Sequence, residues 1–412
     1  MNIFSLIEKE KQRQRSTLQM IASENFVSKD VINAIGSVLT NKYAEGYSGA
    51  RYYNGCEVVD EIENIAIDGA KKLFGCEYVN VQPHSGSQAN AGAYSAVLNA
   101  GDVILGMSLD SGGHLTHGFK VSFSGKIYKA FSYNVSQKDF LLDYDEIEKI
   151  AKEVKPKLII AGFSAYSRIV DWKKFREIAD KVGAMFMADI AHVAGLICKN
   201  EYPSPMEYAD IVTTTTHKTL RGARGGMIMS NNPSLFKKLQ SSVFPGQQGG
   251  PLMNHIAGKA VAFEEALKDE FKNYAIQIKK NAKTLAETLK SRKIDILTGG
   301  TENHIVIVDL RSKNIFGNDV ANILDQCGVI CNKNSVPFDT TSPVKTAGIR
   351  LGTPAITTLG LKEEHMKKIG SIIADTIDAI ANQKISEDFI NTQKDSVSKI
   401  CLDFEFKGTS LE

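Results

Sequence analysis

The sequence has few of the features that proteins use to bind nucleic acids or membranes. There is one tryptophan among 412 residues, and 49 basic against 47 acidic residues leave a formal net charge of +2. This balance creates no large field that would attract nucleic acid or an anionic lipid surface. No apolar run approaches the ~20 residues that a helix needs to cross a bilayer. The sequence therefore predicts neither a nucleic-acid partner nor a membrane partner.

Cysteine is scarce and scattered, and no apolar leader opens the chain. The six cysteines contain no C-x-x-C pair, so neither a disulfide framework nor a redox motif is indicated. The N-terminal stretch becomes charged after seven residues, which is too short for the apolar region of a signal peptide, and it carries acidic residues that a transit peptide avoids. We therefore expect reduced, buried thiols and a cytoplasmic location.

Short apolar strands alternate with amphipathic helices through the first half of the sequence, a pattern typical of a largely parallel α/β sheet. Strands are expected at residues 78–82, 102–107, 126–133, 157–166, 184–191, 210–216 and 225–230. Helices are expected at residues 58–74, 86–100, 143–154 and 171–183.

The flanking regions differ in character. Residues 1–40 predict helices, above all 23–39, whereas the aperiodic stretch 41–57 is rich in Gly, Tyr and charge and predicts a loop that lines a site. A long helical region follows residue 252 and runs to about residue 290. Beyond it we expect a smaller α/β unit, with strands at 294–300, 304–310 and 329–335, a helix at 317–328, and a helical tail from residue 362. Two domains are predicted: residues 1–280, a helical arm plus a large domain, and residues 281–412, a smaller C-terminal domain.

Three of the predicted strands end in chemically unusual groups. Residues 78–82 lead to Ser85, Gly86 and Ser87, which open a helix and offer hydroxyls and backbone N–H groups to a phosphate. The strand 184–191 carries Asp189 at its end, and the strand 210–216 delivers Lys218. Ligands of doubly wound sheets bind outside the carboxyl ends of the strands, so these groups are expected to meet.

Pyridoxal 5′-phosphate (PLP) requires this combination of groups. A lysine holds its aldehyde as a Schiff base, and an aspartate keeps its pyridine nitrogen protonated. A lone lysine is usually a solvated surface charge. Here His217, Arg221 and Arg224 supply neighbours that would help to make the Lys218 amine nucleophilic. The four threonines before Lys218 form the strand that aims it.

Ten motifs extend this interpretation over nearly the whole chain, and their order resembles that of the serine hydroxymethyltransferase family. They are IASENFVS, LTNKYAEGY, RYYNGCE, NVQPHSGSQAN, GGHLTHG, FSAYSR, TTTTHKTLRG, FPGQQGGPL, NKNSVPFD and GIRLGTPAIT. The resemblance implies an aspartate-aminotransferase-like fold (type I), with a mostly parallel seven-stranded sheet and a smaller C-terminal α/β domain. It also implies a reversible transfer of the serine hydroxymethyl carbon to tetrahydrofolate, giving glycine and 5,10-methylenetetrahydrofolate.

The resemblance assigns roles to individual residues. Lys218 holds the cofactor, Asp189 pairs with its ring nitrogen, His114 stacks on its ring, and His217 precedes the lysine without acting as its base. The other residues expected around the cofactor are Ser85, Gly86, Ser87, Ser164, His192 and Tyr43, with Gly249 and Gly250 from a partner subunit. Arg350 holds the substrate carboxylate, because a guanidinium meets two oxygens in one plane. Glu45 is the acid/base at the serine hydroxyl, and Ser23, Tyr53 and His192 complete the substrate site.

The resemblance further implies a folate site and a homodimer with shared active sites. Folate is expected to contact Leu109, Gly113, His114, Leu115, Tyr52, Asn334, Ser342, Pro343 and Val344. The enzyme is expected to be a homodimer in which the arm with Tyr43 and Glu45, and the loop with Gly249, reach into the neighbouring site. Val344, Lys345 and Ala223 depart from the usual family pattern, which bears on folate affinity and on the turn after Lys218.

Other interpretations compete with this one. A PLP-dependent threonine or phenylserine aldolase would share Lys218 and Asp189 but would not need folate. A non-catalytic oligomeric binding protein on the same fold is another alternative, although every residue that the chemistry requires is present. The histidines match no zinc spacing, so no metal site is predicted. An assay of serine cleavage with and without tetrahydrofolate separates the two enzymes.

Overall fold

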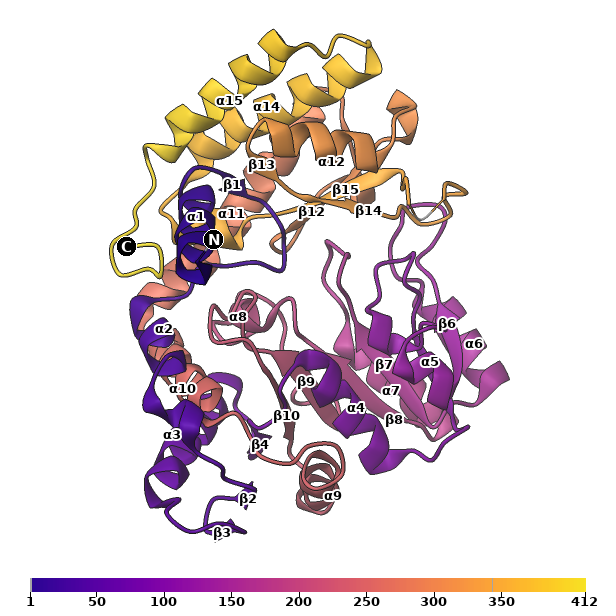
Figure 1. Ribbon diagram of the computed structural model, residues 1–412. Coiled ribbons are helices and arrows are strands. Elements are labelled where there is room, and N and C mark those ends of the chain that lie inside the picture. Colours follow the sequence, from indigo (N-terminus) through magenta and orange to yellow (C-terminus); the bar gives the residue numbers. More distant parts are fainter. Residues whose placement is uncertain (1, 343) are drawn as a thin grey trace.

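A seven-stranded sheet lies at the centre of the larger unit, in the order β4-β10-β9-β8-β7-β5-β6 (Figure 1). The computed structural model describes residues 2–342 and 344–412. The strands of this sheet are β4 (Tyr78–Asn80), β5 (Val103–Met107), β6 (Lys129–Tyr133), β7 (Leu158–Gly162), β8 (Met185–Asp189), β9 (Ile211–Thr215) and β10 (Gly226–Ser230). Strands β5 to β9 pair in parallel, whereas β10 is antiparallel to both of its neighbours. The predicted mostly parallel sheet is confirmed.

Helices cover both faces of this sheet because successive strand residues point to opposite sides. Ile160 and Met187 pack in one core with helices α4 and α9, while their neighbours Ile159 and Phe186 pack in another core with α7. The helices of this unit are α3 (Glu57–Phe74), α4 (Gly86–Val97), α5 (Phe123–Ile127), α6 (Tyr144–Val154), α7 (Trp172–Val182), α8 (Ala194–Ile197), α9 (Pro233–Val243) and α10 (Met253–Leu267), with the 3₁₀ turn η2 (Leu115–His117). Asp143 and Asp171 cap α6 and α7 through their side chains.

The smaller sheet is antiparallel, in the order β11-β12-β15-β14. Its strands are β11 (Asp295–Ile296), β12 (Ile305–Asp309), β14 (Asn332–Asn334) and β15 (Gly348–Gly352). Its helices are α11 (Asp269–Ser291), α12 (Gly317–Gln326), α13 (Pro354–Thr358), α14 (Glu363–Ala381) and α15 (Glu387–Cys401), with turns η3 (Leu297–Gly299) and η4 (Arg311–Lys313). Strand β15 was not predicted, because two of its five residues are glycines and its apolar alternation is limited to Ile349 and Leu351.

The N-terminal region differs most from the prediction. Its elements are α1 (Ile3–Arg15), β1 (Leu18–Gln19), α2 (Lys29–Ile35) and η1 (Val38–Asn41), followed by a small hairpin of β2 (Gly46–Tyr47) and β3 (Ala50–Arg51). Of the helix expected at 23–39, the structure forms α2 and the start of η1. The chain before α2 is not helical: β1 pairs in parallel with β13 (Val329–Ile330), Met20 accepts a hydrogen bond from the Gly352 N–H, and Val27 accepts one from the Ser410 N–H. Long-range pairing has overridden local helical preference here.

The chain passes from one large hydrophobic core to the other within α11. Ile278 belongs to the core of the larger sheet, whereas Ala282 and Leu285 belong to the core of the smaller one, which also buries Leu18 and Met20. The domain boundary near residue 280 stays a prediction. Residues of the N-terminal segment 18–26 pack in the core of the C-terminal unit. Within the described residues, no helix is long and apolar enough to span a bilayer.

Candidate active site

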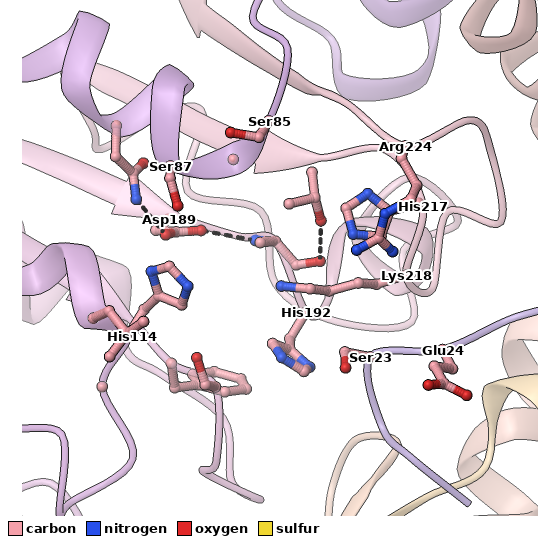
Figure 2. A pocket seen from close by; sticks show the side chains of 18 of the residues that line it. Ser23, Glu24, Ser85, Ser87, His114, Asp189, His192, His217, Lys218 and Arg224 are labelled. Carbon is pink, nitrogen blue, oxygen red and sulfur yellow. Dashed lines mark hydrogen bonds between the residues drawn. The ribbon is translucent and has the colours of Figure 1, made fainter. Parts of the chain in front are cut away.

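A cavity of about 530 Å³ opens at the carboxyl ends of β8 and β9, and Arg350 of β15 also lines it. Figure 2 shows side chains that line this cavity. Many of the predicted site residues line it: Ser23, Ser85, Gly86, Ser87, Leu109, Gly113, His114, Leu115, Ser164, Asp189, His192, His217, Lys218 and Arg350. The structure thus brings together side chains that are 327 positions apart in the sequence, from Ser23 to Arg350. Arg224, expected as a charged neighbour of Lys218, also lines this cavity, as do Glu24 and Asn90, for which no site role was predicted.

Lys218 is buried at the wall of this cavity, and its side chain points toward His114 across it (Figure 2). Burial lowers the pKa of the Lys218 amine to about 8, with Asp189 acting in the opposite direction and Arg350 and Arg224 reinforcing the decrease. Near neutral pH an appreciable fraction of this amine is therefore unprotonated and nucleophilic.

The threonines before Lys218 have a second purpose besides forming β9. The Thr213 hydroxyl donates to Asn90 Oδ1 at 2.6 Å, and the Thr216 hydroxyl donates to the Ala223 carbonyl at 2.6 Å. The Thr219 hydroxyl donates to the His192 carbonyl at 2.8 Å. These bonds satisfy buried hydroxyls and attach the lysine segment to α4, to the loop before β10 and to the loop after β8.

Asp189 ends β8 and accepts three hydrogen bonds. The donors are Asn90 Nδ2 at 2.9 Å, His117 Nε2 at 3.0 Å and the Ala191 N–H at 3.0 Å. Burial alone would raise the pKa of Asp189, but His117 and Asn90 together hold it below its ordinary value. The site therefore contains a buried, ionised carboxylate.

His117 is a positioning residue that the sequence interpretation missed, although its motif GGHLTHG was recognised. The His114 N–H donates to His117 Nδ1 at 3.2 Å, which assigns the ring proton to Nε2 and makes His117 the donor to Asp189. His114, His117 and Asp189 lie close enough to hold a metal ion. Both nitrogens of His117 are already used, however, so the cluster orients Asp189.

His114 lies in the cavity as a neutral ring. Burial lowers its pKa to about 4, with the nearby His117 contributing in the same direction. Its Nδ1 lies 2.7 Å from the Thr116 hydroxyl, which fixes the ring plane. A neutral, fixed imidazole suits stacking against another aromatic ring.

His192 lies beside His304, a second residue that the sequence interpretation missed. Their rings are stacked with centroids 5.4 Å apart, and His192 Nδ1 lies 3.2 Å from His304 Nε2. Burial lowers the pKa of His192 far below its usual range and that of His304 to about 3. One of two neutral rings must donate to the other, so His304 determines which tautomer His192 presents to the cavity.

Arg350 reaches the cavity from β15. Its Nη1 donates to the Ser164 carbonyl at 2.5 Å and its Nε donates to Asn332 Oδ1 at 3.1 Å. Burial lowers the pKa of Arg350 to about 10, so the guanidinium remains charged at neutral pH. Its Nη2 group takes part in neither contact.

A second group of predicted residues lies elsewhere in the same chain. Glu45, Tyr52 and Gly249 line a separate cavity of about 530 Å³, together with residues 244–248. A Cβ at Gly249 would lie 2.8 Å from Glu45 Oε1, and one at Gly250 would lie 3.1 Å from the Tyr43 ring. Tyr43 packs edge-on against Tyr53, with centroids 5.2 Å apart. These six residues lie together and none lines the Lys218 cavity.

Only some of the predicted folate contacts line the Lys218 cavity. Leu109, Gly113 and Leu115 line the Lys218 cavity, and Leu109 and Leu115 are 37% and 48% exposed, as expected at its mouth. Asn334, Ser342 and Val344 come from the smaller unit and do not line that cavity. Pro343 lies outside the described residues.

Comparison with known proteins agrees with this geometry. The family model described as serine hydroxymethyltransferase matches residues 1–373. The chain belongs to the serine hydroxymethyltransferase family. It is 60% identical over 382 residues to a serine hydroxymethyltransferase of Rickettsia akari (strain Hartford), covering 93% of this chain and 91% of that protein. It is also 59% identical over 398 residues to a probable serine hydroxymethyltransferase of Rickettsia bellii (strain RML369-C), covering 97% and 94% of the two chains.

Serine hydroxymethyltransferases are PLP-dependent transferases of fold type I that interconvert serine and glycine with tetrahydrofolate as co-substrate. The residues of this cavity fit that cofactor. Helix α4 begins at Gly86, and its N-terminus with Ser85 and Ser87 suits a phosphate. Ionised Asp189 suits a protonated ring nitrogen, and the Lys218 amine suits an aldehyde. When bound, PLP supplies an electron sink for chemistry at the amino-acid α-carbon.

Proposed function

We propose that the Lys218 cavity is the catalytic site of a serine hydroxymethyltransferase, in which Lys218 attaches the cofactor and Asp189 holds its ring nitrogen. The observation that carries this proposal is the meeting of four groups in one cavity: a buried amine, an ionised carboxylate, a helix N-terminus and a buried guanidinium. Ser85, Gly86 and Ser87 bind the phosphate, His114 stacks on the ring, and Ser164, His192 and His217 complete the cofactor site.

Arg350 binds the carboxylate of serine or glycine. Its guanidinium is buried and already oriented by Ser164 and Asn332, so a carboxylate meets a charged donor of fixed direction. Ser23 and His192 lie on the same cavity wall and contact the amino acid beside Arg350. The pocket thus selects an α-amino acid with a free carboxylate.

Glu45 moves the proton at the serine hydroxyl oxygen and acts from a partner subunit. Glu45, Tyr43, Tyr52, Tyr53, Gly249 and Gly250 lie together at the surface, outside the cavity of their own chain. Tyr43, Tyr52 and Tyr53 are 55%, 75% and 46% exposed, an unusual cluster for a monomer surface. A homodimer in which each subunit completes the other's site accounts for both facts.

Tetrahydrofolate lies at the mouth of the cavity, against Leu109, Gly113 and Leu115, with Tyr52, Asn334 and the 342–344 segment as further contacts. We place the enzyme in the cytoplasm and retain the domain division near residue 280. The alternative activity is a PLP-dependent threonine or phenylserine aldolase, which would need no folate.

An assay of serine cleavage with and without tetrahydrofolate tests the proposal. A transferase converts serine to glycine rapidly only when tetrahydrofolate is present, and the one-carbon unit is recovered as 5,10-methylenetetrahydrofolate. Cleavage of serine at the same rate without folate, with free formaldehyde as product, would replace the transferase by the aldolase.

A further inference from the structure

A buried lysine that the proposed reaction does not use lies behind the phosphate end of the cavity. Lys259, on α10, is 2% exposed, and its ammonium donates to three backbone carbonyls: Val81 at 2.6 Å, Gly226 at 2.9 Å and Pro83 at 3.2 Å. All three N–H groups of the ammonium are therefore used. A buried cation held only by carbonyls is costly unless an anion lies nearby.

Two nearby carboxylates balance the charges in this region. Glu63, whose charge acts on Lys259, pairs with Arg51 at 2.5 Å, and Arg51 also pairs with Asp60 at 2.7 Å, so two cations face two carboxylates. Among the described residues Lys259 forms no ion pair of its own, and burial lowers its pKa to about 7. Lys259 also contributes to lowering the pKa of His217, which lines the cavity, after burial and the charges of Arg224 and Lys218.

The three carbonyls belong to the segments that carry the phosphate-binding groups. Val81 and Pro83 lie in the loop between β4 and α4, four and two residues before Ser85, the N-cap of α4. Gly226 begins β10, and a Cβ there would lie 2.4 Å from the Ser85 carbonyl. Lys259 therefore fixes both sides of the turn from which α4 starts.

Gln248 completes this arrangement. It is 7% exposed, its Oε1 accepts from the His84 N–H at 3.0 Å, and its Nε2 donates to the Gln82 carbonyl at 3.0 Å. Each residue from 81 to 84 thus has a backbone group bound by the side chain of Lys259 or Gln248. One glycine is explained by the same packing: a Cβ at Gly225 would lie 2.7 Å from the Lys259 nitrogen.

We propose that Lys259 and Gln248 are positioning residues for the cofactor phosphate: through hydrogen bonds to its backbone they hold the 81–84 loop that presents the N-terminus of α4. The inference rests on the proposed cofactor site and extends it to residues that do not line the cavity. It implies that the phosphate contributes more to the affinity for PLP when Lys259 is present.

The test compares PLP with pyridoxal, which lacks the phosphate, on apo-protein by absorbance titration. Lys259→Met keeps the length of the side chain and removes its charge. We expect the variant to bind PLP roughly 10- to 100-fold more weakly, from the usual contribution of charge-assisted hydrogen bonds, and to bind pyridoxal as the wild type does. Inorganic phosphate should raise the melting temperature of wild-type apo-protein and raise that of the variant less.

Lys279→Met is the matched control, because Lys279 also donates to a backbone carbonyl, that of Glu201, at 2.8 Å, but lies on α11 away from the cavity. It should leave the affinity for PLP unchanged. Circular dichroism and gel filtration establish that each variant is folded. If Lys259→Met does not fold, Gln248→Met carries the test, with the same split between PLP and pyridoxal and a smaller loss.

Unchanged PLP affinity in the folded variants, or an equal loss of PLP and pyridoxal, would overturn the inference. Neither serine nor folate enters these titrations. A wild-type protein that binds PLP but shows no folate-dependent turnover would therefore overturn the proposed function and leave this inference standing.

Discussion

Lys218 and Glu45 line two different cavities of the same chain. Lys218 lies buried at the end of the large sheet, whereas Glu45 lies against Gly249 in the surface cluster that contains Tyr43, Tyr52 and Tyr53. Because the proposed reaction needs both residues, we expect each site to combine two subunits. This relationship leads directly to a complementation experiment.

Two inactive variants should restore activity when they are mixed. Lys218→Ala and Glu45→Gln, refolded together in equal amounts, form mixed dimers in which one site carries both defects and the other is intact. Random pairing makes half of the dimers mixed, so about a quarter of wild-type activity should return. Lys218→Ala mixed with Arg350→Ala is the control, because both residues line one cavity and every site keeps a defect. Equal recovery in both mixtures, or in neither, would rule out the shared site.

Lys218→Ala should abolish covalent attachment of the cofactor. The lysine is the buried amine that the structure places in this cavity, with a pKa lowered to about 8. We expect the purified variant with added PLP to lack the visible absorption band that borohydride bleaches in the wild type. A bleachable band, with PLP found on another lysine by mass spectrometry, would remove Lys218 from its proposed role.

Arg350→Ala should separate substrate binding from cofactor binding. The variant loses a charge-assisted contact that contributes roughly 1.5–3 kcal/mol, so affinity for serine and glycine should fall about 10- to 150-fold. PLP affinity should persist. Arg350→Lys is the matched control: it keeps the charge but loses the planar fork, so it should recover part of the lost affinity. A parallel loss of PLP would indicate that Arg350 chiefly supports the Ser164 and Asn332 segments.

Glu45→Gln preserves the shape of the side chain and removes its proton-transfer group. The folate-dependent conversion of serine should fall by about 10²- to 10⁴-fold, the usual contribution of a general acid or base. Binding of serine, followed by the change in visible absorption, should survive because Arg350 and Lys218 are unaltered. Wild-type turnover with folate in this variant would favour a packing role for Glu45 and the aldolase alternative.

The stability of the apo-protein should depend on pH through its buried histidines. Burial lowers the pKa of His114 to about 4 and those of His217 and His304 to about 3. Between pH ~6.5 and ~4 the unfolded chain binds protons at these positions and the folded chain does not. Lowering the pH in this window must therefore destabilise the fold, by up to about 1.4 kcal/mol per pH unit for each histidine. The ordinary pKa of Asp189 lies below this window and its folded value is lower still, so it does not oppose the trend.

Urea unfolding at several pH values between 7 and 4.5 measures this slope. His304→Asn removes one of the titrating groups and should reduce the slope by about one proton. A slope that is unchanged in His304→Asn would mean that His304 is not held neutral in the folded protein. Because the comparison uses slopes, a uniform loss of stability in the variant does not affect it.

The sequence by itself determined much of the larger unit. Its strands and helices followed from local apolar periodicity, such as the predicted helices 143–154 and 171–183 that correspond to α6 and α7. Local signals also identified Lys218, Asp189 and the Ser85–Ser87 helix start, since each stands at the end of a strand. Ten ordered motifs added the expected family, which the comparisons confirmed.

Only the tertiary structure decided which groups lie together and which residues they form hydrogen bonds with. Strand β15 is too rich in glycine to be recognised locally, and it forms because β12 and β14 pair with it on either side. The roles of His117, His304 and Lys259 depend on hydrogen bonds to residues 72, 112 and up to 178 positions away. The segment 18–20 is extended because it pairs with β13 and Gly352, contacts that no local pattern encodes. Local preference sets the elements, but burial and long-range hydrogen bonding set the protonation, the orientation and the neighbours of the groups that carry the chemistry.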